Sequence, residues 1–218
     1  MVLKIDLHMH TSHSPDSLMS PEQVVRRCQE VGLACIAITD HNTILGAIEV
    51  QRIAPFRIIV GEEIRTLEGE IVGLFLKEDV PKGLSPIETA KHIKDQGGLI
   101  SIPHPFDRLR RSVITRSGLE ELRPYVDIIE GFNARNTFQA ANKKAMDLAG
   151  NWGVLVSSVS DAHTTMELGY AYTDVPEWAD TPESFKSALS QATLVTHPTT
   201  PLIHVLTTLT KGWKHFKR

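Results

Sequence analysis

The sequence is poor in cysteine, with Cys28 and Cys35 as its two cysteines among 218 residues. Cys28 falls in a stretch with helical periodicity and Cys35 in a short apolar run, so we expect buried free thiols rather than a disulfide. Free thiols of this kind fit a reducing compartment, and the cytoplasm is the expected location.

Long apolar runs and an excess of basic charge are also missing. The chain has no run of about 18 apolar residues, which a membrane span requires, and it does not begin with the basic and apolar regions of a signal peptide. We therefore expect no membrane partner. The formal net charge is −3 with neutral histidines, which excludes an overall basic field for nucleic acid but not a local basic patch.

Apolar residues make up 41% of the chain, enough for a sizeable core, and we expect one domain over residues 1–218. Strand-like runs alternate with helical patterns, which predicts a parallel α/β architecture, either a barrel or a doubly wound sheet. The short turn between the third and fourth strands predicts a hairpin. Strands are predicted at 3–8, 33–39, 57–64, 69–76, 99–103, 126–132 and 153–159, and helices at 20–32, 43–54, 85–98, 136–149, 181–192 and, as a packed basic tail, 211–218.

Histidines and carboxylates follow nearly every predicted strand. His8 and His10 lie two residues apart in an alternating stretch, so both side chains project from one face of the first strand. Because functional residues of parallel α/β folds gather at the carboxyl ends of strands, we expect these groups to meet in one site. The other candidates at or near strand ends are Asp16, Asp40, His41, Glu62, Glu63, Glu70, His104, Glu130, Asn133, Asp161 and His163.

The mixture of imidazole and carboxylate, without cysteine, disfavours a structural zinc knot and suits zinc, manganese or iron(II) in a hydrolytic site. The candidates outnumber the ligands of one tetrahedral ion. We therefore expect two or three divalent metal ions with a bridging carboxylate. Such a cluster clamps a phosphoryl group and creates a hydroxide at neutral pH, which predicts hydrolysis of phosphate esters.

Five short motifs carry a family resemblance: D-L-H-M-H-T, I-T-D-H-N, G-E-E-I, P-H-P and S-D-A-H, in this order between residues 6 and 169. Together they resemble the polymerase and histidinol phosphatase (PHP) superfamily of phosphoesterases. The resemblance implies a distorted seven-stranded (β/α) barrel, similar to a TIM barrel, with a metal cluster at the strand carboxyl ends. It also implies a substrate that is a phosphorylated small molecule or a short nucleic-acid end, attacked by a metal-bridged hydroxide.

The resemblance also implies roles for individual residues. The first ion would be held by His8, His10, Glu63 and Asp161. Glu63 would bridge to a second ion shared with His104, and the third ion would be held by Asp16, His41 and His163. Within this set we assign catalytic roles to Glu63, Asp161 and His163.

Two glutamates of the third and fourth predicted strands have more than one possible assignment. Glu63 is preferred to Glu62 because the family's bridging carboxylate directly precedes an apolar residue, here Ile64. Glu70 stands where many members have a histidine, so it is either a further metal ligand or an ordinary hairpin residue.

Substrate contacts are assigned to Arg108, Arg135 and Asn133, with Arg110 and Arg111 as alternatives to Arg108, since arginine binds phosphate through a planar fork. The alternative for the arginine-rich segment 106–116 is a solvated loop. Asp6 either supports a metal ligand by hydrogen bonding or forms a salt bridge within the barrel. Asp40 either orients His41 in the same way or caps the helix that follows. Two other functions stay open: a metallo-amidohydrolase acting on C–N bonds, and a non-catalytic metal-binding PHP module.

Overall fold

The computed structural model describes residues 1–199, so the predicted tail helix at 211–218 lies outside the described residues. Within that part, the strands are β1 (Val2–Asp6), β2 (Cys35–Ile38), β3 (Arg57–Thr66), β4 (Gly69–Leu74), β5 (Leu99–Ile102), β6 (Ile128–Asn133), β7 (Leu155–Val159), β8 (Tyr172–Pro176) and β9 (Thr193–Val195). The helices are α1 (Pro21–Val31), α2 (Leu45–Ile53), α3 (Pro86–Asp95), α4 (Arg116–Leu122), α5 (Gln139–Trp152) and α6 (Pro182–Leu189).

All described strands form one mixed sheet in the order β7-β6-β5-β4-β3-β2-β1-β8-β9. The seven predicted strands are β1 to β7, and the predicted hairpin is the antiparallel pair of β3 and β4. The expectation of seven strands is corrected, because the described residues add β8 and β9 to give nine. These two short strands pair antiparallel beside β1.

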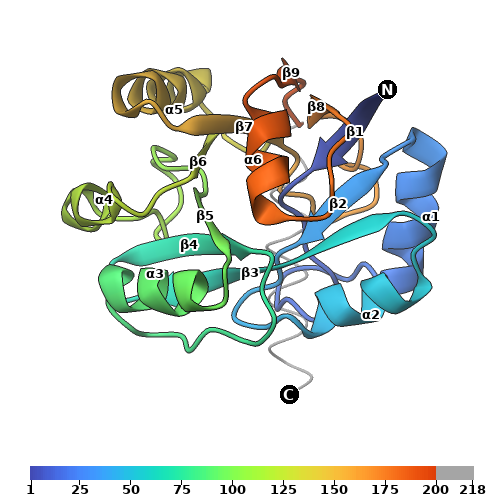
Figure 1. The fold of residues 1–218 in the computed structure, drawn as a ribbon, viewed down its shortest axis with the longest axis horizontal. Helices are drawn as coiled ribbons and strands as arrows, with labels where there is room; N and C mark the ends of the chain where they lie inside the picture. The colour runs from blue at the N-terminus through green and yellow to red at the C-terminus, as the bar shows by residue number, and fades with distance from the viewer. Residues whose placement is uncertain (200–218) are drawn as a thin grey trace.

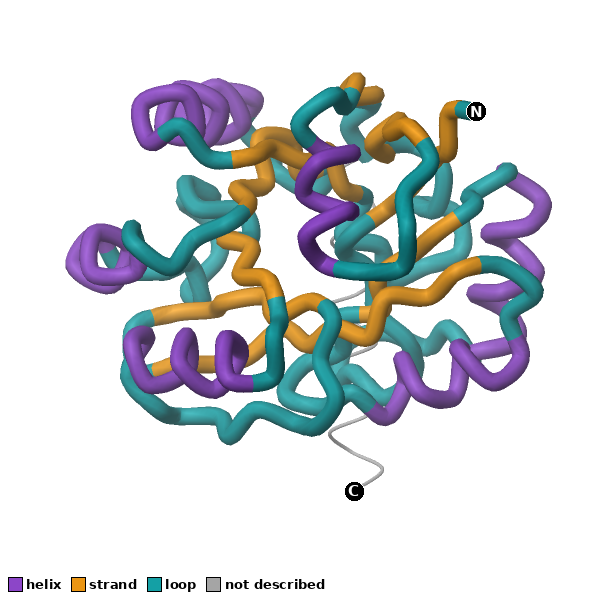
Figure 2. The backbone as a smooth tube through the Cα atoms, in the orientation of Figure 1, coloured by secondary structure: helices purple, strands orange, loops and turns teal. Residues whose placement is uncertain are grey.

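The sheet curls into a nearly closed barrel (Figures 1 and 2). Side-chain hydrogen bonds connect β7 to the other end of the sheet: the Ser158 amide donates to the Thr173 hydroxyl at 2.9 Å, and the Ser158 hydroxyl donates to the Val195 carbonyl at 2.7 Å. Beyond the strands, the His10 amide donates to the Ala162 carbonyl at 2.9 Å. The loops that follow β1 and β7 therefore lie side by side.

Capping explains where the helices begin. Ser20 and Ser85 each form a capping box, with Gln23 and Glu88 as the reciprocal partners, and proline occupies the first turn of both helices. These serine, proline and glutamate patterns were the basis for predicting α1 and α3. Helix α4 was not predicted, because its arginine-rich beginning has little apolar periodicity. Its N-cap is Thr115, whose side chain accepts a hydrogen bond from Gly118.

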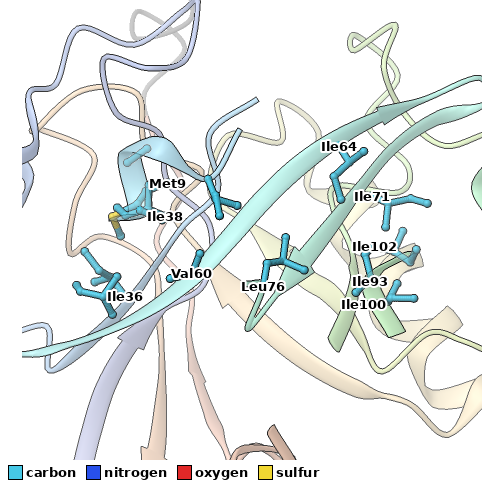
Figure 3. Packing of buried hydrophobic residues seen from close by; sticks show 14 of the residues in the cluster. Met9, Ile36, Ile38, Val60, Ile64, Ile71, Leu76, Ile93, Ile100 and Ile102 are labelled. Carbon is cyan, nitrogen blue, oxygen red and sulfur yellow. The ribbon is translucent and has the colours of Figure 1, made fainter. Parts of the chain in front are cut away.

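Two apolar cores lie on the two faces of the sheet. The outer core packs the sheet against helices and includes Met9, Ile36, Ile38 and Ile64 (Figure 3). The inner core fills the barrel and includes Ile5, Cys35, Ile59, Leu74 and Phe185. Successive residues of β2 alternate between the two cores, as the period of a strand requires.

Helix α6 closes one end of the barrel. Its Phe185 is fully buried in the inner core, and its Lys186 lies 2.8 Å from Asp127 at the start of β6. Asp127 also pairs with Lys94 of α3. The open end of the barrel is therefore the one at which the parallel strands finish.

Both cysteines are free and buried, as predicted. Burial raises the pKa of the Cys35 thiol to about 12, so the thiol is protonated and unreactive at neutral pH. No helix within residues 1–199 is long and apolar enough to cross a membrane.

Candidate metal centre

Polar side chains from the ends of six strands converge at the open end of the barrel. The long strand β3 shows how their direction is fixed. Ile59 points into the inner core, and Glu63, four residues later, points to the same side. Glu62 points the other way, where its carboxylate accepts a hydrogen bond from the Val80 amide at 2.8 Å. This geometry agrees with the choice of Glu63 over Glu62.

Four side chains place one atom each around a common centre. The Nε2 atoms of His8 and His10 are 3.1 Å apart. The Glu63 Oε2 atom lies 3.5 and 3.4 Å from these two nitrogens, and the Asp161 Oδ1 atom lies 3.6 and 3.5 Å from them. Ligands placed tetrahedrally at about 2.0–2.2 Å from a zinc ion are separated by roughly 3.3–3.6 Å. The two nitrogens together with either carboxylate oxygen are therefore spaced as ligands of one tetrahedral ion would be, and His8, His10 and Glu63 form a group that could hold a metal ion.

The two carboxylate oxygens of this set face imidazole nitrogens without forming a hydrogen bond to them. Glu63 Oε2 and Asp161 Oδ1 are buried and have no hydrogen-bond partner within residues 1–199. A buried carboxylate oxygen without a partner carries a large desolvation cost. A divalent cation would compensate both oxygens, so the residues present fit a metal ion.

Glu63 lies at the middle of the whole cluster. Its second oxygen, Oε1, is 3.0 Å from His104 Nε2, while Oε2 is also 3.1 Å from His41 Nδ1. One carboxylate therefore faces imidazoles that follow β1, β2 and β5. This is the position that a carboxylate bridging two ions requires.

Asp16 brings together the remaining predicted ligands. Its two oxygens lie 3.4 Å from His41 Nε2 and 3.4 Å from His163 Nε2. Glu70, on the interior face of β4, offers an oxygen within 4.8 Å of ligand atoms of His41 and Glu63. All nine residues predicted to bind metal thus lie in one connected cluster.

Hydrogen bonds outside the cluster fix the orientation of the two histidines after β1. His8 Nδ1 lies 2.5 Å from Glu130 Oε1, which directs Nε2 of His8 toward the centre. Glu130 also accepts hydrogen bonds from the His104 amide and the Asn133 side chain, both at 2.8 Å. Asn133, predicted to contact substrate, therefore contacts Glu130 and, at 3.1 Å, Asp161.

His10 is held by a separate hydrogen-bonded chain. Its Nδ1 lies 3.0 Å from the Ser14 hydroxyl, which donates to Asp40 at 2.7 Å. Asp40 also accepts two hydrogen bonds from Thr11. A side chain at position 46 would collide with this carboxylate, because a Cβ on Gly46 would lie 2.0 Å from Asp40 Oδ2. Asp40 therefore orders the loop after β1 and supports His10 through Ser14, whereas support of His41 or capping of α2 was expected; the N-cap of α2 is Ile44.

Asp6 lies at the seam between β1 and β7 and does not reach the metal ligands' side chains. Its Oδ1 accepts hydrogen bonds from the Ser160 amide at 3.1 Å and the His8 amide at 3.4 Å. Burial raises the pKa of Asp6 to about 7, although these hydrogen bonds oppose the shift. Its role is to connect the loops that carry His8 and Asp161.

Sequence reasoning missed Glu167, which is fully buried. One of its oxygens accepts hydrogen bonds from the amides of His163 and Thr164, both at 2.9 Å. The other oxygen lies 3.4 Å from Nη1 of Arg135, which is also buried, with an exposed fraction of 5%. Glu167 therefore connects the His163 loop to Arg135. Its place four residues after the S-D-A-H motif was a signal that could have found it.

Arg108 and Arg110 are two residues apart in the sequence but have different surroundings in the structure. Arg108 is exposed, whereas Arg110 contacts the Asp161 carboxylate directly and lies 3.2 Å from Asp107. Arg110 was considered at the sequence level but Arg108 was assigned. Arg110, rather than Arg108, is the arginine that this loop brings into the cluster.

Electrostatics keep the central carboxylates ionised. Burial opposes the charge of Glu63 and Asp161, but His41 and His8 hold the pKa of Glu63 well below its usual range. Arg110 has the largest opposing effect on Asp161 and likewise lowers its pKa. Both carboxylates are therefore available as anionic ligands.

Other members of the cluster respond differently to the same burial. Burial, followed by the neighbouring His163, lowers the pKa of His10 to about 3, so this imidazole is neutral, as a metal ligand must be. Burial and then the charge of Glu63 raise the pKa of Glu70.

Two members of the cluster have unusual backbone conformations. His104 and Asp161 have φ values of +32° and +52°, a region that residues other than glycine rarely adopt. Such conformations persist where the surroundings fix them, and they concentrate at functional sites. Here they turn a side chain inward directly after β5 and β7.

Comparison with known proteins agrees with this geometry. The PHP domain family matches residues 6–192, and the chain therefore belongs to that family. The uncharacterized protein MJ1587 of Methanocaldococcus jannaschii is 39% identical over 158 residues, which cover 66% of this chain and 90% of that protein. A 5′-3′ exoribonuclease of Haemophilus influenzae is 34% identical over 103 residues, covering 44% of this chain and 37% of that enzyme.

A solved structure shows the same fold. It is a two-domain protein from Bacteroides vulgatus that contains a predicted PHP-like metal-dependent phosphoesterase. The superposition has a TM-score of 0.75 with 19% sequence identity, and it covers 90% of this chain and 65% of that one. The chain therefore spans about two thirds of the length of this structural relative.

Proposed function

We propose that this chain is a metal-dependent phosphoesterase that hydrolyses the phosphate ester of a phosphorylated small molecule or of a 5′ nucleic-acid end. The observation that carries the proposal is the pair of Nε2 atoms of His8 and His10, which are 3.1 Å apart and each lie 3.4–3.6 Å from one carboxylate oxygen of Glu63 and one of Asp161. Membership of the PHP family, and the name of the exoribonuclease relative, support the same chemistry.

The cluster would hold two or three divalent ions, with zinc, manganese or iron as candidates. His8, His10, Glu63 and Asp161 would hold the first, Glu63, His104 and Glu70 the second, and Asp16, His41 and His163 the third. When bound, such ions supply Lewis acidity toward the phosphoryl oxygens and lower the pKa of water.

The chain's own residues would bind and orient the substrate. Arg110 extends a guanidinium to Asp161 at the centre, where it would donate hydrogen bonds to a phosphate oxygen. Arg135, buried against Glu167, would contribute a second positive charge nearby. Asp161 and His163 are the groups we assign to proton movement, since both lie where the scissile phosphate would bind.

A phosphate-release screen tests the proposal. Purified protein is reconstituted with manganese, zinc or iron(II) and assayed with phosphomonoesters, short 5′-phosphorylated oligonucleotides and, as a comparison, cyclic amides. We expect metal-dependent phosphate release and more than one transition metal per chain by elemental analysis. Cleavage of the amides without phosphate release would favour the amidohydrolase alternative. Metal binding without any turnover would favour the non-catalytic alternative.

A further inference from the structure

A pocket of about 210 Å³ lies between the segment that follows β5 and the beginning of α5. The α5 wall is connected to the cluster through Asn142, which accepts a hydrogen bond from the Asn133 amide at 3.1 Å, while the Asn133 side chain donates to Asp161 at 3.1 Å. The other wall is close to the cluster in sequence. Phe106 stands two residues after His104, and Arg108 stands two residues before Arg110, which contacts Asp161. The pocket is lined by Phe106, Arg108, Phe138, Ala140, Ala141 and Lys144.

The lining combines two aromatic rings with two cations and contains no carboxylate. Phe138 is 53% exposed although it is a large apolar side chain, so its ring is available to a ligand. Ala140 and Ala141, in the first turn of α5, contribute small side chains to the lining. Arg108 and Lys144 are both exposed at this pocket and give it positive charge.

We infer that this pocket binds the base of a 5′-nucleotide, whose 5′-phosphate occupies the metal centre and whose next phosphate, where one is present, contacts Arg108 and Lys144. The inference rests on the proposed function. Aromatic side chains bind bases of any sequence by stacking, and basic residues follow the phosphate backbone. The volume is below the roughly 300–1,000 Å³ of a pocket for a whole ligand, so it suits one ring system of a larger substrate.

The same charges disfavour a different class of phosphate ester. A leaving group that carries an ammonium would be repelled by Arg108 and Lys144, with no lining carboxylate to compensate. The pocket therefore selects for an aromatic or anionic leaving group and against an aminoalkyl one.

The test of the base subsite uses adenosine, which contains the base but no phosphate, and ribose as its control. Binding to Phe138→Ala and to wild-type protein is measured by calorimetry or by ligand-observed NMR. We expect wild-type protein to bind adenosine better than ribose, and Phe138→Ala to weaken adenosine binding by about tenfold or more. Leu109→Ala is the matched control, because Leu109 is 65% exposed in the same segment and does not line the pocket. Equal binding of adenosine to Phe138→Ala and wild type would overturn the inference.

The charged part of the pocket is tested by turnover. We expect Arg108→Ala to lower kcat/KM about tenfold or more for a 5′-phosphorylated adenosine dinucleotide, with a smaller effect on adenosine 5′-monophosphate. Equal losses on both would overturn the assignment of Arg108 to the second phosphate. Faster wild-type hydrolysis of phosphoethanolamine than of adenosine 5′-monophosphate would overturn the predicted selectivity.

These outcomes separate the pocket from the proposed function. Adenosine binding requires no hydrolysis, so protein that cleaves no phosphate ester would contradict the proposed function while the titration still decides the pocket.

Discussion

Both ends of the barrel contain fully buried side chains, but of opposite kinds. At the end closed by α6, Phe185 has 0% exposure among apolar neighbours. At the open end of the strands, His8, Glu63 and Asp161 also have 0% exposure. Burial of an apolar ring stabilises the fold, whereas burial of a carboxylate costs free energy unless a cation compensates it. Apolar burial at the first end therefore offsets the free-energy cost of burying charged side chains at the second end.

The largest effect is expected from removing a predicted ligand at the open end. Asp161→Asn and His163→Ala should each lower phosphoester turnover by more than about 100-fold, because removing a mere hydrogen-bond partner of a ligand already costs about 10–100-fold. The fold should remain, since neither side chain belongs to an apolar core. Turnover assays together with circular dichroism check both parts, and full activity in either variant would contradict the assigned cluster.

A neighbouring pair of glutamates gives a sharper comparison within β3. Glu63→Gln should lower metal content and turnover strongly, because a neutral amide no longer supplies charge to the His41 and His104 side of the cluster. Glu62→Gln is the matched control, since Glu62 points to the other face and contacts the Val80 amide. If Glu62→Gln were inactive and Glu63→Gln active, the assigned face of β3 would be wrong.

The closed end should respond in the opposite way. Phe185→Ala should lower the free energy of unfolding by about 3–5 kcal/mol, the usual cost of a cavity left by a buried phenylalanine. Metal content per folded chain should not change. Chemical denaturation measures the first effect, with exposed Leu67→Ala as control (Leu67 is 74% exposed). A loss of metal without a loss of stability would contradict the division between the two ends.

The smallest effect is expected from Glu167, which positions the His163 loop without belonging to the cluster. Glu167→Ala should lower metal affinity or turnover by about 10–100-fold, as for other residues that orient a ligand. Glu167→Gln retains an oxygen that can accept from the His163 amide, so it should restore part of the loss. If both variants lost only thermal stability and bound metal normally, the role of Glu167 would be structural alone.

The regular elements were predictable where local signals were strong. Alternating or continuous apolar runs predicted β1 to β7, and the capping boxes at Ser20 and Ser85 predicted α1 and α3. Strands β8 and β9 escaped prediction because the first ends in Pro176 and the second is three residues long. Strand β8 forms through pairing with β1, and β9 through pairing with β8, rather than through a pattern of their own.

The sequence by itself determined which residues gather at the open end, because the carboxyl ends of parallel strands meet at one edge of a sheet and His8, His41, His104 and Asp161 each follow a strand. Only the tertiary structure decided which neighbours support them. Three features depend on loop conformations. Arg110 rather than Arg108 reaches the cluster, Glu167 contacts the His163 loop, and Phe106 and Phe138 line the same pocket. Loop conformations follow from packing between distant segments, which no local pattern records.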